Sequence, residues 1–119
     1  SNPPAHGAEV VVTILSDNAP GGLREQWCGE LAAMRDRIND MRQAFKAGLA
    51  GRGVKLTPRG NDFVVQQNGM FTMSGLRKDH VDALREQHSI YIVGSGRSNV
   101  AGMTPGNLPV LCDAIADVF

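Results

Sequence analysis

Arg97 is the residue whose type and surroundings best suit binding chemistry. It lies between Gly96 and Ser98 at an expected strand break, where small neighbours would leave the guanidinium uncovered. A planar guanidinium can hold a carboxylate or a phosphate through two parallel hydrogen bonds. A solvated arginine in a glycine-rich turn is the alternative interpretation, because such turns are common.

Other kinds of site are poorly supported by the sequence. Gly94 and Gly96 lack the third glycine of a dinucleotide-binding fingerprint, and a strand rather than a helix is expected after them. The three histidines have no carboxylate or cysteine at metal-ligand spacing and are expected at the surface or in loops: His6, His80 and His88. The three lysines have polar surroundings that do not suit a nucleophilic amine: Lys46, Lys55 and Lys78.

Composition limits the possible partners. The chain has 119 residues, enough for one small domain, and its 12 Lys plus Arg balance its 12 Asp plus Glu. Zero net charge argues against a broad basic face for nucleic acid or an anionic membrane. No apolar run approaches the roughly 20 residues of a membrane span, and the first residues lack the basic-then-apolar order of a signal peptide, so a cytoplasmic location is expected. Cys28 and Cys112 form no Cys-x-x-Cys pair, and two buried thiols are predicted.

The N-terminal part is expected to be helical. Residues 10–14 favour a strand by propensity, whereas the apolar spacing of residues 8–15 after Pro3 and Pro4 favours a helix, which we prefer. Turn-forming residues then fill 17–22. A long amphipathic helix follows, with its apolar stripe formed by Leu23, Trp27, Leu31, Met34, Ile38, Met41, Phe45 and Leu49.

The polar residues of this helix are assigned to its solvated face: Arg24, Glu30, Arg35, Asp36, Arg37, Asp40, Arg42 and Lys46. Arg37 and Asp40 are spaced to pair one turn apart. At 1.5 Å per residue the helix is roughly 40 Å long, more than so small a domain needs. We therefore expect it to bridge to something outside this chain, with Leu23 and Trp27 poorly covered by the chain itself; a coiled coil is the alternative.

Short strands and helices are expected after Gly60. Strands are predicted at 63–67 and 70–73 around an Asn68-Gly69 hairpin turn, and further strands at 90–93 and 98–101. Helices are predicted at 76–88 and at the C-terminus, where Pro109 moves the expected start to Asn107. This order predicts an α+β fold, a two-layer sandwich.

Four motifs, in order, carry a family resemblance that covers nearly the whole chain. They are Ser1 to Ala8, Trp27 to Arg42 with its Met-Arg-x-Arg-Ile core, Gln67 to Leu76 with Asn-Gly-Met-Phe, and Ser95 to Met103 with Ser-Gly-Arg-x-Asn-Val-Ala-Gly-Met. Their order and spacing resemble the C-terminal third of class I aminotransferases, in particular the aspartate and aromatic amino acid aminotransferases. The resemblance implies the small C-terminal domain of the aspartate aminotransferase fold (fold type I), preceded by a bridging helix.

The resemblance also implies roles for individual residues. Arg97 matches the arginine that holds the substrate α-carboxylate, and Asn99 and Gly96 belong to the same turn and would position it. Phe71 matches an aromatic residue that lines the substrate pocket. Ser1 and Asn2 match the segment that approaches the partner subunit's active site in the family's homodimer.

The family's remaining machinery has no counterpart in this sequence. The Schiff-base lysine, the pyridine-binding aspartate and the phosphate-binding arginine lie upstream in the family, so pyridoxal 5'-phosphate would be bound by an upstream domain, and no catalytic residue is expected here. The chain is accordingly expected to be a piece of a longer enzyme, with residues 1–22 on the large-domain and dimer-interface side, 23–52 as the bridging helix and 53–119 as the small domain. Met73 and Arg77 depart from the family pattern.

The function implied is transfer of an amino group between aspartate or an aromatic amino acid and a 2-oxo acid such as 2-oxoglutarate. Two other readings stay open: a carboxylate-binding or protein-interaction module without catalysis, and a helix-rich oligomerisation element. The sequence leaves open the choice between aspartate and aromatic substrates.

Overall fold

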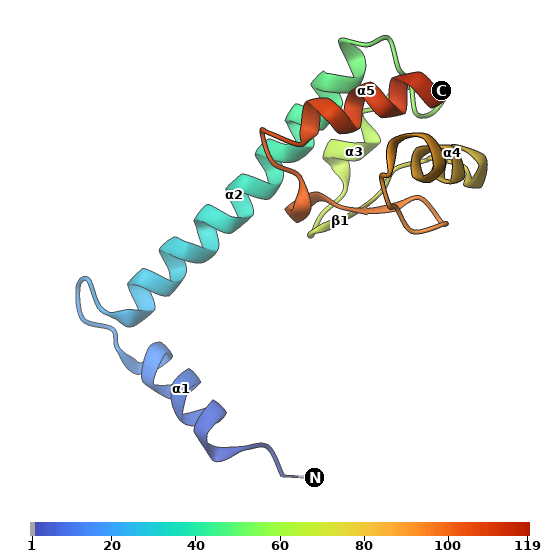
Figure 1. Ribbon diagram of the computed structural model, residues 1–119. Coiled ribbons are helices and arrows are strands. Elements are labelled where there is room, and N and C mark those ends of the chain that lie inside the picture. Colours follow the sequence, from blue (N-terminus) through green and yellow to red (C-terminus); the bar gives the residue numbers. More distant parts are fainter. Residues whose placement is uncertain (1) are drawn as a thin grey trace. The chain divides into compact units, whose positions relative to one another are not determined.

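The computed structural model describes residues 2–119, and helices dominate it (Figure 1). The chain divides into two compact units, one ending at Asp36 and the other running from Arg37 to Phe119. The boundary between them falls within a long helix. Among the described residues, none of the helices combines the length and the apolar character needed to cross a membrane.

The unit that ends at Asp36 begins with helix α1 (Ala5–Ser16). Pro4 stands at the N-cap in an extended conformation, so entry at the prolines outweighs the strand propensity of the following valines. The preference for a helix over a strand here is confirmed. None of the residues of α1 is buried by the described chain, and Val11 and Val12 are exposed.

A tight turn starts the second helix. The Asp17 carboxylate accepts a hydrogen bond from the Leu23 N–H at 2.9 Å, and the Glu25 carboxylate accepts one from the Gly21 N–H at 2.6 Å. A side chain at Gly22 would place its Cβ 2.6 Å from Asp17 Oδ1, which explains the glycine there. The contact to Asp17 satisfies the first N–H of α2 (Leu23–Ala50), which has no partner within the helix, and the contact to Glu25 holds the turn before it.

The two ends of α2 differ in burial. Phe45 and Leu49 are buried, whereas Leu23 is 40% exposed and Trp27 is 44% exposed. The long helix and its poorly covered N-terminal half are both confirmed. Cys28 is exposed in this half, so the prediction of a buried thiol is wrong there, although it holds for Cys112.

The C-terminal unit packs its remaining elements around the end of α2. They are α3 (Phe63–Gln66), β1 (Phe71–Met73), α4 (Lys78–His88), β2 (Arg97–Asn99), the 3-10 turn η1 (Val100–Gly102) and α5 (Leu108–Val118). Figure 1 shows α5 beside the C-terminal end of α2, with α4 next to α5. The fully buried core side chains include Leu49, Val64, Val81, Leu84, Val100 and Ile115. Each stabilises the fold by roughly 1.5–3 kcal/mol.

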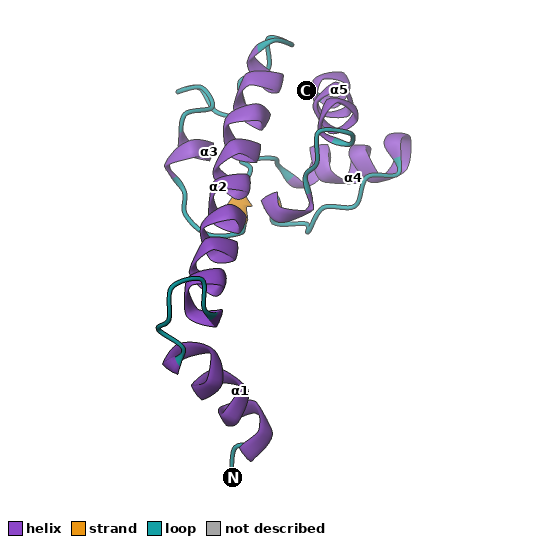
Figure 2. Cartoon of the chain, turned by 90° about the vertical axis from the view of Figure 1, so that its left-hand side faces the viewer, coloured by secondary structure: helices purple, strands orange, loops and turns teal. Residues whose placement is uncertain are grey.

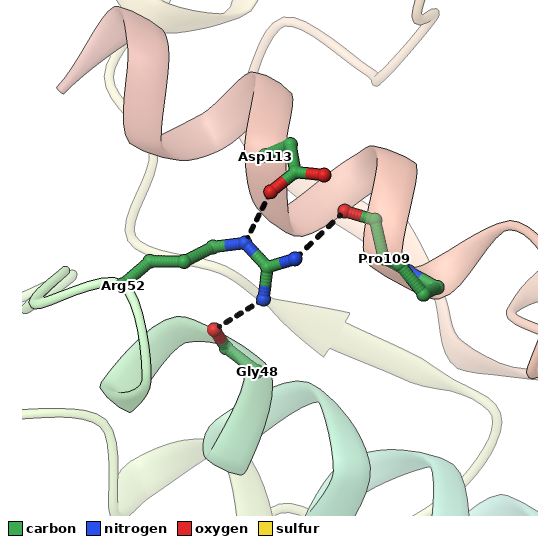
Figure 3. Close-up of polar contacts among 4 residues, drawn as sticks. All are labelled: Gly48, Arg52, Pro109 and Asp113. Carbon is green, nitrogen blue, oxygen red and sulfur yellow. Dashed lines mark hydrogen bonds and ion pairs between the residues drawn. The ribbon is translucent and has the colours of Figure 1, made fainter.

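Arg52 joins the end of α2 to α5 (Figure 3). Its Nε donates to Asp113 Oδ1 at 2.6 Å, while its terminal nitrogens donate to the carbonyls of Gly48 at 2.9 Å and Pro109 at 3.4 Å. The Arg52 guanidinium lowers the pKa of the Asp113 carboxyl by hydrogen bonding and by charge. Directly beneath, Gly48 lies so near α5 that a Cβ would come 2.8 Å from Cys112 Sγ.

The sheet is smaller than predicted (Figure 2). Residues 63–67 do not form a strand: Phe63–Gln66 is a helical turn, in which the Val64 and Val65 N–H groups donate to the carbonyls of Asn61 and Asp62. Val64 is thereby fully buried, and tertiary packing overrides strand propensity. Gly69 does form a turn, with φ of +81°, but it leads from α3 into β1 and no hairpin results.

β1 pairs instead with β2, antiparallel, with Phe71 opposite Asn99 and Met73 opposite Arg97. The strand predicted at 90–93 is also wrong, since Ile90 to Val93 belong to no sheet and their side chains alternate between partly buried and exposed. The strand predicted at 98–101 is shifted, ending at Asn99 where the 3-10 turn begins. The described fold is therefore helix-rich with one two-stranded sheet.

The surface or loop position predicted for the histidines is wrong for His80, which is buried, while His88 makes a contact at the surface. The His80 ring is buried, stacks on the Phe119 ring with centroids 4.5 Å apart, and lies 2.8 Å from Arg77 Nη2 through its Nε2. His88 Nε2 lies 3.0 Å from Asp117 Oδ2. The His80–Phe119 and His88–Asp117 contacts join α4 to the C-terminal end of the chain. α5 itself begins at Leu108, one residue after the start predicted at Asn107, which forms the N-cap.

Candidate functional site

Arg97 begins β2 with its side chain exposed. Its guanidinium carbon lies 4.8 Å from the centroid of the Phe71 ring, within the range of a cation–π contact. Among the described residues, Arg97 takes part in none of the ion pairs and none of the side-chain hydrogen bonds. The N–H groups of its guanidinium are thus open to an acceptor that enters from outside.

The turn before Arg97 requires glycine. Gly96 has φ of +78°, a left-handed conformation that strains other residues. A Cβ at this position would also lie 2.6 Å from the Leu76 carbonyl oxygen. The Gly96 carbonyl accepts hydrogen bonds from the Ser74 N–H at 3.0 Å and from Ser74 Oγ at 2.6 Å. The backbone that carries Arg97 is therefore fixed against the end of β1.

A hollow of about 610 Å³ opens beside this arginine. Apolar side chains supply most of its wall, among them Ile90, Ile92, Val110 and Leu111. Of the described residues that line it, Arg97 is the only one with a charged side chain. A mostly apolar concavity with one well-placed polar group is the usual form of a small-molecule site. This one suits a small molecule that carries a carboxylate beside an apolar portion.

The other residues singled out from the sequence have different positions. Phe71 is 45% exposed and lines the hollow next to Arg97. Asn99 also lines it, although its Oδ1 accepts a hydrogen bond from the Ala101 N–H at 3.0 Å and so starts the 3-10 turn. Asn2 is exposed and belongs to the unit that ends at Asp36, and Ser1 lies outside the described residues. The structure thus brings together Phe71, Arg97 and Asn99.

Arg42 is the residue that sequence reasoning missed. We placed it on the solvated face of the long helix, but its side chain is only 1% exposed. Its Nη1 donates to the Val64 carbonyl at 2.8 Å, and its Nη2 donates to the carbonyls of Gly69 at 2.7 Å and Phe71 at 2.8 Å. Burial lowers the pKa of Arg42.

A signal for this burial exists in the sequence. Arg42 comes four residues after Ile38 and three before Phe45, which places it on the apolar stripe by helical geometry. Arg37 is a second correction on the same helix. It does not pair with Asp40; its guanidinium donates to the carbonyls of Ala101 at 3.1 Å and Met103 at 2.7 Å.

The lysines of this chain do not suit a covalent cofactor such as pyridoxal phosphate. Lys46 pairs with Asp62 at 2.7 Å, and Lys78 pairs with Asp82. Lys55 is exposed. A lysine that acts as a nucleophile must lose its proton, which burial or a nearby cation favours and a carboxylate opposes. None of the three lysines therefore has the surroundings that such a nucleophile needs.

Comparison with known proteins identifies the family. The family model of aminotransferase classes I and II matches residues 1–115, and the chain belongs to this family. It is 53% identical over 119 residues to the aspartate aminotransferase of Escherichia coli (strain K12), covering 100% of this chain and 28% of that relative. The resemblance to class I aminotransferases is confirmed.

Solved structures agree with the sequence comparison. An aromatic-amino-acid aminotransferase from Burkholderia pseudomallei, covalently bound to pyridoxal phosphate, matches with a TM-score of 0.88 and 43% identity, over 99% of this chain and 28% of that one. The cytoplasmic aspartate aminotransferase of Saccharomyces cerevisiae matches with a TM-score of 0.84 and 41% identity, over 99% and 27%. The chain thus spans somewhat more than a quarter of the length of these relatives.

Proposed function

We propose that this chain forms the C-terminal part of a pyridoxal-phosphate-dependent aminotransferase and that Arg97 binds the α-carboxylate of its substrates. The observation that carries the proposal is the open guanidinium of Arg97 on the Phe71 ring, at the edge of an apolar hollow. Family membership supports the reaction class, since the matched relatives are named as aspartate or aromatic amino acid aminotransferases.

Each residue of the site has a part in this proposal. The Arg97 fork holds both oxygens of the α-carboxylate, a contact worth more than a single neutral hydrogen bond because donor and acceptor are both charged. One face of the Phe71 ring contacts the guanidinium, and the part of the ring that lines the hollow offers the substrate an apolar surface. Asn99 and Gly96 hold the backbone on either side of Arg97.

The amino acid and the 2-oxo acid that exchange the amino group both carry this carboxylate. One arginine therefore serves both halves of a reaction between aspartate or an aromatic amino acid and a 2-oxo acid such as 2-oxoglutarate. In the proposal the cofactor is held by residues outside this chain, because the three lysines here do not fit that role.

The proposal extends to organisation and location. Residues 1–22 belong to the large-domain and dimer-interface side, 23–52 form the bridging helix, and 53–119 form the small domain, an α+β two-layer sandwich. The uncovered apolar residues Leu23 and Trp27 support contact with other parts of a homodimer. Ser1 and Asn2 would reach the partner subunit's site. The proposed location is the cytoplasm, which is supported by relatives from rice and yeast that are named as cytoplasmic.

The test is a transaminase assay on the full-length protein that contains this chain. We expect amino transfer from aspartate or an aromatic amino acid to 2-oxoglutarate, and a loss of kcat/KM of about 100-fold or more in Arg97→Lys, since lysine cannot reproduce the bidentate contact. Absence of transfer with every amino acid tried would instead favour a carboxylate-binding module without catalysis.

A further inference from the structure

Arg42 is a buried cation that has no carboxylate partner among the described residues. Burying a charge is costly unless its donors are used. Its two terminal nitrogens make three hydrogen bonds, all to backbone carbonyls, whereas its Nε has no partner in the described part of the chain. The charge is therefore stabilised by the peptide dipoles of residues 64–71, which lead into β1.

One of these hydrogen bonds, to the Phe71 carbonyl, falls on the open edge of β1. On the paired edge, the Met70 carbonyl accepts from the Val100 N–H at 2.8 Å. Successive carbonyls of a strand alternate between its two edges, so the Phe71 carbonyl faces away from β2. There Arg42 Nη2 donates to it at 2.8 Å.

The Gln67 side chain completes the same edge. Its Oε1 accepts from the Met73 N–H at 2.8 Å, and its Nε2 donates to the Met73 carbonyl at 3.2 Å. Arg42 and Gln67 thus satisfy β1 where a third strand would otherwise pair. The Phe71 carbonyl is held by Arg42 on the open edge, while the carbonyl of its neighbour Met70 is held by Val100 on the paired edge.

This support matters because the position of the Phe71 ring follows the position of its backbone. The ring is 45% exposed, and the Arg97 guanidinium rests on it without any other side-chain partner among the described residues. A shift of the Phe71 backbone would move the ring and release the guanidinium. The orientation of Arg97 thus depends on β1 and on whatever holds β1.

We propose that Arg42 is a positioning residue for the carboxylate site: by holding the Phe71 carbonyl, it fixes the ring that orients the Arg97 guanidinium. The inference rests on the proposed function, in which Arg97 binds the substrate carboxylate. Arginine is needed because its fork spans the Val64 carbonyl on one side and the Gly69 and Phe71 carbonyls on the other. A lysine ammonium keeps the charge but acts from a single point.

The experiment compares variants of the full-length protein in the transaminase assay. Arg42→Lys is expected to raise KM for the amino acid about tenfold and to change kcat less than about twofold, since Arg97 holds the carboxylate in ground state and transition state alike. Arg52→Met is the matched control, because Arg52 lies just beyond α2 and also donates to two carbonyls, but contacts α5 rather than β1. It should lower the thermal unfolding temperature and leave KM unchanged.

A double-mutant cycle separates positioning from loss of stability. In a Phe71→Leu background, the ring through which Arg42 acts is gone, so Arg42→Lys should add less than about a twofold increase in KM. An equal tenfold increase in both backgrounds would overturn the inference, as would an unchanged KM in the folded single variant. If Arg42→Lys does not fold, Arg42→Gln replaces it, and failure of both to fold would show that Arg42 serves the fold itself, which also overturns the inference.

The outcomes also separate this inference from the proposed function. An unchanged kcat/KM in Arg97→Lys would refute the carboxylate role of Arg97, whatever Arg42 does. A large loss in Arg97→Lys together with no KM effect in Arg42→Lys would refute the positioning role of Arg42 alone.

Discussion

Replacing Gly96 with alanine should loosen the turn that carries Arg97. Two separate costs arise at this position. An L-residue in the left-handed region costs about 1–2 kcal/mol. The added Cβ would lie 2.6 Å from the Leu76 carbonyl oxygen, whereas ordinary contacts begin at 3.4 Å, so the backbone must give by the difference of 0.8 Å. Overpacking of this kind costs about 1–3 kcal/mol.

The sum, about 2–5 kcal/mol, can be read locally by hydrogen exchange of the full-length protein. The Ser74 amide is the reporter, because it donates to the Gly96 carbonyl at 3.0 Å. Its exchange should accelerate at least about 30-fold in Gly96→Ala, since each 1.4 kcal/mol corresponds to a factor of ten. KM for the amino acid should rise as well, because the Arg97 backbone is displaced.

Gly53→Ala is the matched control. Gly53 has a similar φ of +72°, but a Cβ there would have no atom within 4 Å. Its reporter is the Val54 amide, which donates to the Leu49 carbonyl at 3.0 Å, and only the conformational cost of about 1–2 kcal/mol should appear there. Equal acceleration at the two reporters would refute the argument that close approach to Leu76 makes Gly96 special.

Three further predictions concern an ion pair, a buried thiol and the cofactor. Arg52 lowers the pKa of Asp113 in the folded state, so the pair stabilises the fold at pH values above 3.8, the ordinary pKa of the carboxyl group. This stabilisation disappears as the pH falls through the lowered pKa. The free energy of unfolding of Asp113→Asn should therefore depend less on pH in that range. Burial raises the pKa of the Cys112 thiol, so mass spectrometry should find it resistant to alkylation at pH 8 until the protein unfolds. Residues 1–119 alone should give no saturable visible absorption band with pyridoxal phosphate, and a band with amino transfer would show that this chain suffices.

The long helix illustrates what the sequence predicts well. Its apolar residues recur at three- and four-residue spacing over 27 positions, from Leu23 to Leu49, and the structure has α2 from Leu23 to Ala50. A periodic signal of this length outweighs local propensity. The turn before it and the start of α5, to within one residue, are predictable for a different reason, because both depend on local residues such as Asp17 and Asn107.

Short elements could not be predicted in the same way. Residues 63–67 and 90–93 have strand propensity, but whether a strand forms depends on a partner at the right distance, which lies elsewhere in the chain. Val64 is instead fully buried in a helical turn, where tertiary packing overrides its strand propensity. The residues around Asn68-Gly69 do turn, yet β1 pairs with β2, a strand that local sequence predicts at shifted bounds but does not identify as the partner.

The candidate site also contains residues that the sequence predicts and one that it does not. Arg97 and Phe71 were predicted from motif resemblance, and the structure places them in contact. Arg42 was missed because a charged residue was assigned to the solvated face by type, although helix geometry placed it on the apolar stripe. Its burial depends on three carbonyls from residues 64–71, which only the folded chain brings together.

The central claim, that Arg97 binds the substrate carboxylate, is tested most directly by a substrate comparison. The full-length protein and its Arg97→Met variant are assayed with an amino acid and with the same amino acid whose α-carboxylate is an amide. We expect the unmodified protein to prefer the carboxylate by about 100-fold or more in kcat/KM, and Arg97→Met to lose nearly all of that preference. A variant that still prefers the carboxylate by the full factor would contradict the account.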